Sequence, residues 1–262
     1  MEVKIIVGYH NSSYLYQSDA LTPIQLGRAI SEEHLKGMIG DDTGDNISAK
    51  NKSFCELTGL YWLWKNIDAD IYGLFHYHRF LDFSNKYPDY PIFQNININD
   101  WNSEIISTAM KEYDIALPCK DIHDISLYNW YKNSHYINDL DIALNIIKEK
   151  YPDYGNIAKD VLDKNGGYFC NLFVAKKEIF NDYCSWIFDI LFELEKRIDI
   201  ANRDDYQKRV FGYISERLIN VYLEAHSELR RLEVHKVTMQ EPIRYACIKS
   251  LKIKSGKVIH EK

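Results

Sequence analysis

Short apolar runs alternate along the chain with longer segments in which apolar residues recur at helical spacing. Runs rich in β-branched and aromatic residues predict buried strands at residues 3–7, 71–75, 113–118 and 168–174, and an alternating run predicts a last strand at 231–239. Helical spacing predicts helices at residues 53–66, 99–112, 138–150, 178–197 and 206–224. This alternation predicts an α/β single domain with a mostly parallel central sheet flanked by helices.

The helix predicted at residues 53–66 begins with the spacing of a capping box, because Ser53 and Glu56 lie three residues apart. This spacing favours a structural role for Glu56 as a cap over a role as a catalytic base. Trp62 and Trp64 on the same helix are more typical of a core than of a platform for a sugar ring.

The composition is that of a soluble globular protein of 262 residues, with 46% hydrophobic and 27% charged residues. The net charge of -6 argues against a nucleic-acid partner, which would require a basic surface. The five cysteines are widely spaced without a CxxC pair, so neither a zinc site nor a disulfide framework is indicated. With no secretory signal and no apolar run of about 20 residues, we expect a cytoplasmic protein.

Ligands of open α/β sheets bind beyond the carboxyl ends of strands, and polar residues gather at three such ends. We expect donor-binding residues at Tyr9 and His10, at Asn171, and at His76, Tyr77, His78 and Arg79. An arginine fork matches phosphate oxygens, and histidine can add a donor or a charge. The hypothesis is that cationic side chains neutralise a leaving diphosphate without a metal, with Mn²⁺ or Mg²⁺ as the alternative. A half-buried histidine and a structural salt bridge are the plainer interpretations of His76 and Arg79.

The loop at residues 40–48 is the second candidate for chemistry, since it carries three carboxylates within five residues. Carboxylates can accept sugar hydroxyls or act as a general base. The plainer interpretation is an Asp/Gly turn that leads into the next helix. The residues expected to contact the donor here are Asp41, Thr43, Asn46, Ser48 and Asn51.

Two charged residues of the helix at 206–224 complete the set of candidates. Arg209 and Glu216 lie about two turns apart on nearly one face. Arg209 is expected to bind the donor. Glu216 could activate an acceptor hydroxyl, or it could pair with a neighbouring arginine. No P-loop, GxGxxG, nucleophile elbow or HExxH motif occurs, which removes the usual support for NTPase, dehydrogenase, serine hydrolase or zincin activity.

The C-terminal segment differs from the rest of the chain in charge. Residues 228–262 contain nine Lys or Arg and four Asp or Glu, a balance of about +5. We therefore divide the chain into a domain at 1–227 and a basic extension at 228–262. The extension is expected either to pack on the domain or to face an anionic membrane surface.

Several longer motifs resemble a bacterial family found in capsule and O-antigen gene clusters. This family was formerly classed as a domain of unknown function and is now treated as a glycosyltransferase family. The motifs include Gly40-Asp41-x-Thr43-Gly44-Asp45-Asn46-Ile47-Ser48, Gly73-Leu74-x-His76-Tyr77-x-Arg79 and Arg209-x-Phe211-Gly212-x-Ile214-Ser215-Glu216. The family usually has His-Tyr-Arg-Arg where this chain has His76-Tyr77-His78-Arg79, so Arg79 is the firmer phosphate ligand.

The resemblance implies a GT-A-like fold and transfer of a sugar, with galactofuranose from its UDP donor as the first candidate, to a lipid-linked glycan of capsule or O-antigen. It also implies inverting chemistry with one carboxylate base, for which Asp45 and Glu216 are the candidates. A cytoplasmic location at the inner face of the plasma membrane, with peripheral contact through the basic C-terminus, would suit that acceptor. The alternative is a non-catalytic subunit that binds a nucleotide sugar or glycan in a polysaccharide assembly complex.

Overall fold

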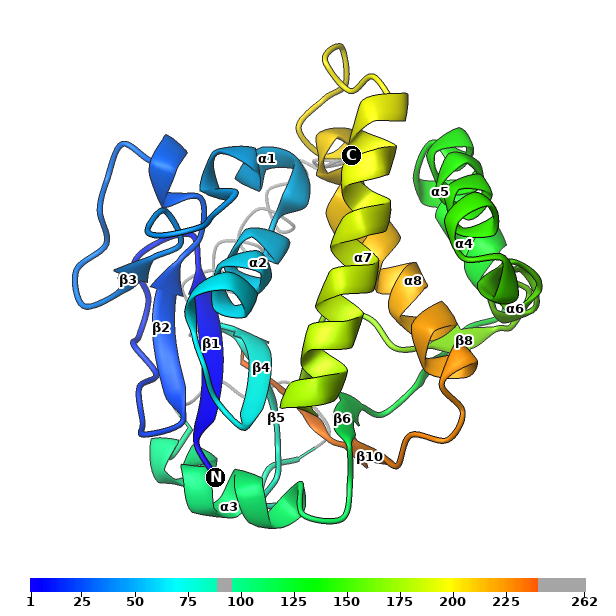
Figure 1. The fold of residues 1–262 in the computed structure, drawn as a ribbon. Helices are drawn as coiled ribbons and strands as arrows, with labels where there is room; N and C mark the ends of the chain where they lie inside the picture. The colour runs from blue at the N-terminus through cyan, green and yellow to red at the C-terminus, as the bar shows by residue number, and fades with distance from the viewer. Residues whose placement is uncertain (89–95, 240–262) are drawn as a thin grey trace, which may run out of the picture.

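A computed structural model describes residues 1–88 and 96–239 (Figure 1). Its central sheet has the strand order β10-β6-β9-β4-β1-β2-β3, and β5 and β11 extend the sheet beside β4. The strands are β1 (Val3–Tyr9), β2 (Leu21–Gln25), β3 (Ile39–Gly40), β4 (Ile71–His76), β5 (Arg79–Leu81), β6 (Ile115–Pro118), β9 (Phe173–Lys176), β10 (Arg231–Val234) and β11 (Lys236–Thr238).

The sheet is mostly parallel, as the alternation of elements predicts. Strand β1 pairs in parallel with β2 and β4, β2 with β3, and β6 with β10. Strand β9 is antiparallel to both of its neighbours, β4 and β6. Consequently the residues that precede β9 lie at the same edge of the sheet as the residues that follow β1 and β4. The reversed direction of β9 thus brings the parts of the site together.

Helices cover both faces of the sheet, and each face has its own hydrophobic core (Figure 1). In β1, Ile6 packs into one core while Ile5 and Val7 pack into the other, as expected for a strand buried on both faces. The helices are α1 (Asn51–Phe54), α2 (Leu57–Asn66), α3 (Ser103–Ala109), α4 (Leu127–Ser134), α5 (Ile137–Lys150), α6 (Pro152–Leu162), α7 (Lys177–Arg197) and α8 (Val210–Ala225).

Four short 3-10 turns and one small two-stranded sheet complete the described elements. The turns are Arg28–Ile30, Ser48–Lys50, Ile98–Trp101 and Gln207–Arg209, and the small sheet pairs β7 (Asp121–Ile122) with β8 (Gly166–Gly167). No helix among the described residues is both long and apolar enough to cross a membrane.

Three differences from the predicted elements affect the site. The predicted helix at 53–66 is two helices, α1 and α2, separated by a sharp turn at Cys55. The predicted strand at 168–174 begins only at Phe173, and the preceding residues form a loop. Strand β2 was not predicted because Pro23 lies inside it, and proline usually argues against a strand interior.

The segment that we assigned to a C-terminal extension begins inside the sheet. Strand β10 pairs with β6, and β11 pairs with β5. Residues 240–262, which carry most of the basic charge, lie outside the described residues. The membrane-facing role of that segment therefore stays a prediction.

Candidate active site

The site begins with the turn between α1 and α2. Cys55 adopts φ 52° and ψ −129°, which ends α1 and turns the chain so that Glu56 points toward α8 and the loop before β9. The predicted capping box is wrong, because the Ser53 Oγ donates to the Lys50 carbonyl at 3.2 Å. The Glu56 carboxylate accepts instead from the Asn171 side chain at 2.7 Å. Glu56 is thus a buried acid, only 8% exposed, held across 115 residues of sequence.

The loop before β9 is the second part of the site. Cys170 and Asn171 both have left-handed backbone conformations, with φ of 70° and 48°. The Cys170 N–H donates to Glu216 Oε1 at 3.0 Å, and the Cys170 carbonyl accepts from His76 Nε2 at 2.7 Å. One two-residue turn therefore contacts Glu56, Glu216 and His76, because β9 runs against β4.

Glu216 lies on α8 and is engaged through both oxygens. Its Oε1 accepts from Cys170, and its Oε2 pairs with the Arg217 guanidinium at 2.9 Å. Burial raises the pKa of Glu216, and Arg217 opposes that rise. Arg217 is itself buried against the rings of Trp130 and Tyr131. Both hypotheses for Glu216 remain open, but the pairing with an arginine is present.

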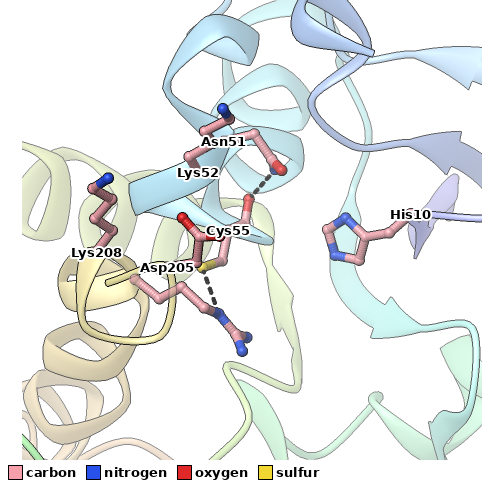
Figure 2. Close-up of a pocket in the computed structure, with 7 residues that line it drawn as sticks. His10, Asn51, Lys52, Cys55, Asp205 and Lys208 are labelled. Atoms are coloured by element: carbon pink, nitrogen blue, oxygen red, sulfur yellow. Dashed lines mark hydrogen bonds between the residues drawn. The ribbon is translucent and has the colours of Figure 1, made fainter. Parts of the chain in front are cut away.

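A cavity of about 420 Å³ opens beside these groups (Figure 2). Arg209 Nε donates to the Cys55 Sγ at 3.3 Å, and Asn51 Nδ2 donates to the Cys55 carbonyl at 2.7 Å, so the turn at Cys55 forms part of the wall. Figure 2 shows His10 across the open space from Lys208. The cavity is lined by His10, Asn51, Lys52, Cys55, Asp205, Lys208 and Arg209.

The three histidines of the site are neutral at pH 7, which refines the hypothesis of a cationic clamp. Burial lowers the pKa of His10 and His76, and burial together with Arg79 lowers the pKa of His78 to about 4. Positive charge must therefore come from the arginines and from Lys52 and Lys208 in the cavity wall. In residues 1–88 and 96–239 the Arg79 side chain has no hydrogen bond or ion pair, and Arg209 has only its bond to sulfur. Both guanidinium groups keep donors for a ligand.

The strand ends contain two aromatic residues, Tyr9 and Tyr77, that pack against each other. Tyr9 is fully buried; its hydroxyl accepts from the Tyr16 N–H at 3.0 Å and donates to the Tyr14 carbonyl at 3.1 Å. Its ring stacks on Tyr77 with centroids 5.8 Å apart. These contacts give Tyr9 a structural role, while the neighbouring His10 reaches the cavity.

Asp41 organises the loop at residues 40–48 from its interior. Its carboxylate is fully buried and accepts from the backbone N–H groups of Gly27 and Arg28 and from the hydroxyls of Ser48 and Thr58. All four bonds are internal to the protein. The structure thus supports the plainer interpretation of Asp41 and Ser48, namely a structured turn.

The rest of this loop faces α2 and not the cavity. Thr43 accepts from Trp62 Nε1 at 2.9 Å. Asn46 closes a local turn by accepting from the Ser48 N–H at 3.1 Å. Asp45 lies on the surface, where its backbone pairs with the Asn66 amide. None of these three side chains belongs to the lining of the cavity.

The structure brings together most of the residues expected at the strand ends, together with Arg209 and Glu216. It also adds residues that the sequence did not single out, namely Lys52, Cys55, Asp205, Lys208 and Cys170, and it places Glu56, which the sequence favoured as a cap, next to Asn171. The capping-box spacing indicated a local cap at Glu56 and not a contact with Asn171. No local sequence pattern indicates the turn at Cys55 that points the Glu56 side chain toward Asn171. No group of three potential metal-ligating side chains occurs within the described ranges, and metal dependence stays a prediction.

Comparison with known proteins adds a family and a structural relative. A solved structure of WbbM, described as a bifunctional glycosyltransferase in its apo form, superimposes with a TM-score of 0.85 and 34% identity over 92% of this chain. The chain spans 46% of that protein. No curated protein sequence matches. The α/β domain is therefore the fold of part of a glycosyltransferase. The family model "Domain of unknown function (DUF4422)" matches residues 4–227, and the chain belongs to that family.

Proposed function

We propose that this protein is a glycosyltransferase that moves a sugar from a nucleotide-diphosphate donor to a glycan acceptor. The observation that carries the proposal is the grouping of two arginines and two glutamates at the carboxyl ends of β1 and β4, next to a cavity that one of the arginines, Arg209, lines. Guanidinium groups can bind the phosphates of the donor, and a carboxylate can act as the base that activates an acceptor hydroxyl, so both groups that the reaction requires are present at this site. The 34% identity to a glycosyltransferase supports the same conclusion.

Arg79 and Arg209 are proposed to bind the diphosphate and to stabilise its charge as it leaves. His10, His76 and His78 are neutral and contribute hydrogen-bonding groups instead of charge. The Nδ1 of His78 is buried without a partner in the described chain, which suits a ligand that supplies one. Lys52 and Lys208 add positive charge at the cavity wall.

The finer assignment is a UDP-sugar donor, with galactofuranose as the first candidate, and an inverting, metal-independent transfer. The acceptor is proposed to be a lipid-linked glycan of a surface polysaccharide. This assignment rests on the family resemblance, and the exposed arginine donors support the metal-independent part. A non-catalytic nucleotide-sugar or glycan receptor remains the second candidate, since the same cavity would bind without turnover.

Release of UDP from UDP-galactofuranose, measured without and with excess EDTA, tests the proposal. We expect slow cleavage of the donor by water that EDTA leaves unchanged. UDP-glucose and UDP-galactose serve as parallel donors. Binding of a donor without any release of UDP would favour the receptor. Complete loss of activity in EDTA, restored by Mn²⁺, would overturn metal independence alone.

A further inference from the structure

Backbone strain in this protein gathers around one carboxylate. Among the described residues, four that are not glycine have left-handed φ angles: Cys55, Asn85, Cys170 and Asn171. Two of these four adjoin Glu56, Cys55 in sequence and Asn171 through its hydrogen bond, and Cys170 directly precedes Asn171. Each such conformation costs about 1–3 kcal/mol and persists where the surrounding structure enforces it, which is common at active sites. The strain indicates that the position of Glu56 matters more than local stability.

Glu56 is held by one oxygen and keeps the other available. Oε1 accepts from Asn171 Nδ2, whereas Oε2 has no hydrogen bond to any described residue. The Asn171 amide is itself fixed, because its Oδ1 accepts from Ser215 Oγ at 2.9 Å and its Nδ2 also donates to the Gly212 carbonyl at 3.3 Å. A carboxylate with one oxygen anchored and one free is arranged to accept a proton.

The charge of Glu56 acts on several groups in and beside the cavity. Its negative charge raises the pKa of His10 and of His76, although burial lowers both further. It likewise contributes to raising the pKa of the Arg209 guanidinium. Cys55, the residue before it, lines the cavity wall. Glu56 therefore lies among the groups proposed to bind the donor.

Glu216 differs from Glu56 in the engagement of its oxygens. Both of its oxygens are engaged, one by the Cys170 N–H and one by Arg217. To accept a proton from a substrate, it would have to release Arg217, whose side chain is buried with no other acidic partner among the described residues. Its contacts instead fix the turn at Cys170, which in turn fixes Asn171 and His76.

We infer that Glu56 is the catalytic base of the proposed transfer and that Glu216 is a positioning residue acting through the Cys170–Asn171 turn. Glu56 Oε2 takes the proton of the acceptor hydroxyl, the acceptor oxygen forms a bond to the anomeric carbon, and the bond from that carbon to the diphosphate oxygen breaks. The diphosphate leaves with the electron pair, and Glu56 later returns the proton to solvent. The inference rests on the proposed function.

The experiment compares Glu56→Gln, Glu56→Ala, Glu216→Gln and the wild type in UDP-galactofuranose cleavage, with UDP affinity measured by calorimetry for each. Glutamine preserves the bond from Asn171, so Glu56→Gln is expected to fold and to bind UDP within about threefold of the wild type. Its turnover should fall about a hundredfold to ten-thousandfold, as loss of a general base requires. Glu216→Gln should keep a larger share of turnover and change KM as well, because it loosens the turn.

Azide separates a base from a structural group. Azide carries no proton to remove, so it should restore release of UDP in Glu56→Ala by at least tenfold, with a glycosyl azide as the product, and should not help Glu216→Gln. Near-normal turnover of Glu56→Gln, or rescue by azide only in the Glu216 variant, would overturn the inference while leaving the transferase intact. A wild type that releases no UDP from any donor tested would overturn both the function and the inference.

Discussion

Replacing Asp41 with asparagine tests whether the acidic loop is a structural core or a ligand site. The carboxylate accepts from Gly27 N–H at 2.8 Å and Thr58 Oγ1 at 2.6 Å through one oxygen, and from Arg28 N–H at 3.0 Å and Ser48 Oγ through the other. An asparagine offers one oxygen. The hydroxyls can rotate to accept from its NH₂ group, but a backbone N–H cannot reverse, so one buried N–H loses its partner.

The expected cost follows from these four bonds. One unsatisfied buried N–H costs about 1–3 kcal/mol, and the remaining bonds lose about 1 kcal/mol each when the charge is removed. We expect Asp41→Asn to lower the free energy of unfolding by about 4–6 kcal/mol. For a chain of this length each kcal/mol lowers Tm by about 2–4 °C, so the melting temperature should fall by roughly 10–20 °C.

Asp45→Asn is the matched control, since the same change is made four residues away on the surface. Its side chain accepts one long bond, from Tyr61 at 3.2 Å, so we expect a loss below about 1 kcal/mol. Differential scanning fluorimetry and urea unfolding measure both variants, and calorimetry measures UDP binding at a temperature where both are folded. Equal melting temperatures for the two variants, or an Asp41→Asn protein of wild-type stability that no longer binds UDP, would refute the reasoning.

Two further predictions concern pH and the backbone. Folding lowers the pKa of the histidines, so the unfolded chain takes up protons at a higher pH than the folded protein does. The stability that the neutral rings contribute is therefore present above about pH 6.5. It is lost as the pH falls toward the pKa of the folded state, which is about 4 for His78. The wild-type Tm should therefore fall between pH 6.5 and 5 more steeply than that of His78→Gln, and parallel curves would contradict this. Gly44 has φ +57°, and a Cβ there would lie 1.9 Å from the Asn66 Oδ1, so Gly44→Ala should cost about 2 kcal/mol in urea unfolding. The helical control Gly155→Ala, whose new Cβ would lie 3.4 Å from Lys148, should not destabilise the protein, and similar losses would contradict the strain argument.

Periodicity predicted the main strands and helices because their apolar positions are set by burial on one or both faces. It failed where burial is not periodic. The two-residue strand β3 is too short to show a pattern, and Pro23 disguises β2. Likewise α6 begins with Pro152 in its first turn, only two residues after α5 ends at Lys150, so the apolar spacing of α5 and α6 shows no clear break.

The candidate site could be predicted only in part, for a related reason. His76 and Arg79 follow a recognisable strand, so the rule that ligands bind at strand ends locates them. Glu56 could not be found in this way, because its role depends on a left-handed Cys55 and on an amide 115 residues away. Spacing within a segment shows local caps, whereas the direction of a buried side chain is set by tertiary contacts. Asp41 shows the opposite error. The acidic loop suggested a ligand site, but the Asp41 carboxylate accepts hydrogen bonds from the protein's own backbone N–H groups.

A crystal structure of the wild-type protein with UDP tests the central claim most directly. The account predicts that the nucleotide occupies the cavity of about 420 Å³ and that its diphosphate oxygens lie within hydrogen-bonding distance of the Arg79 and Arg209 guanidinium groups. It also predicts that Glu56 does not contact the diphosphate and lies where the acceptor hydroxyl would approach, on the side of the sugar opposite the leaving group. UDP bound elsewhere, for example beside Lys148 and Lys159 in the groove between α5 and α6, would contradict the claim.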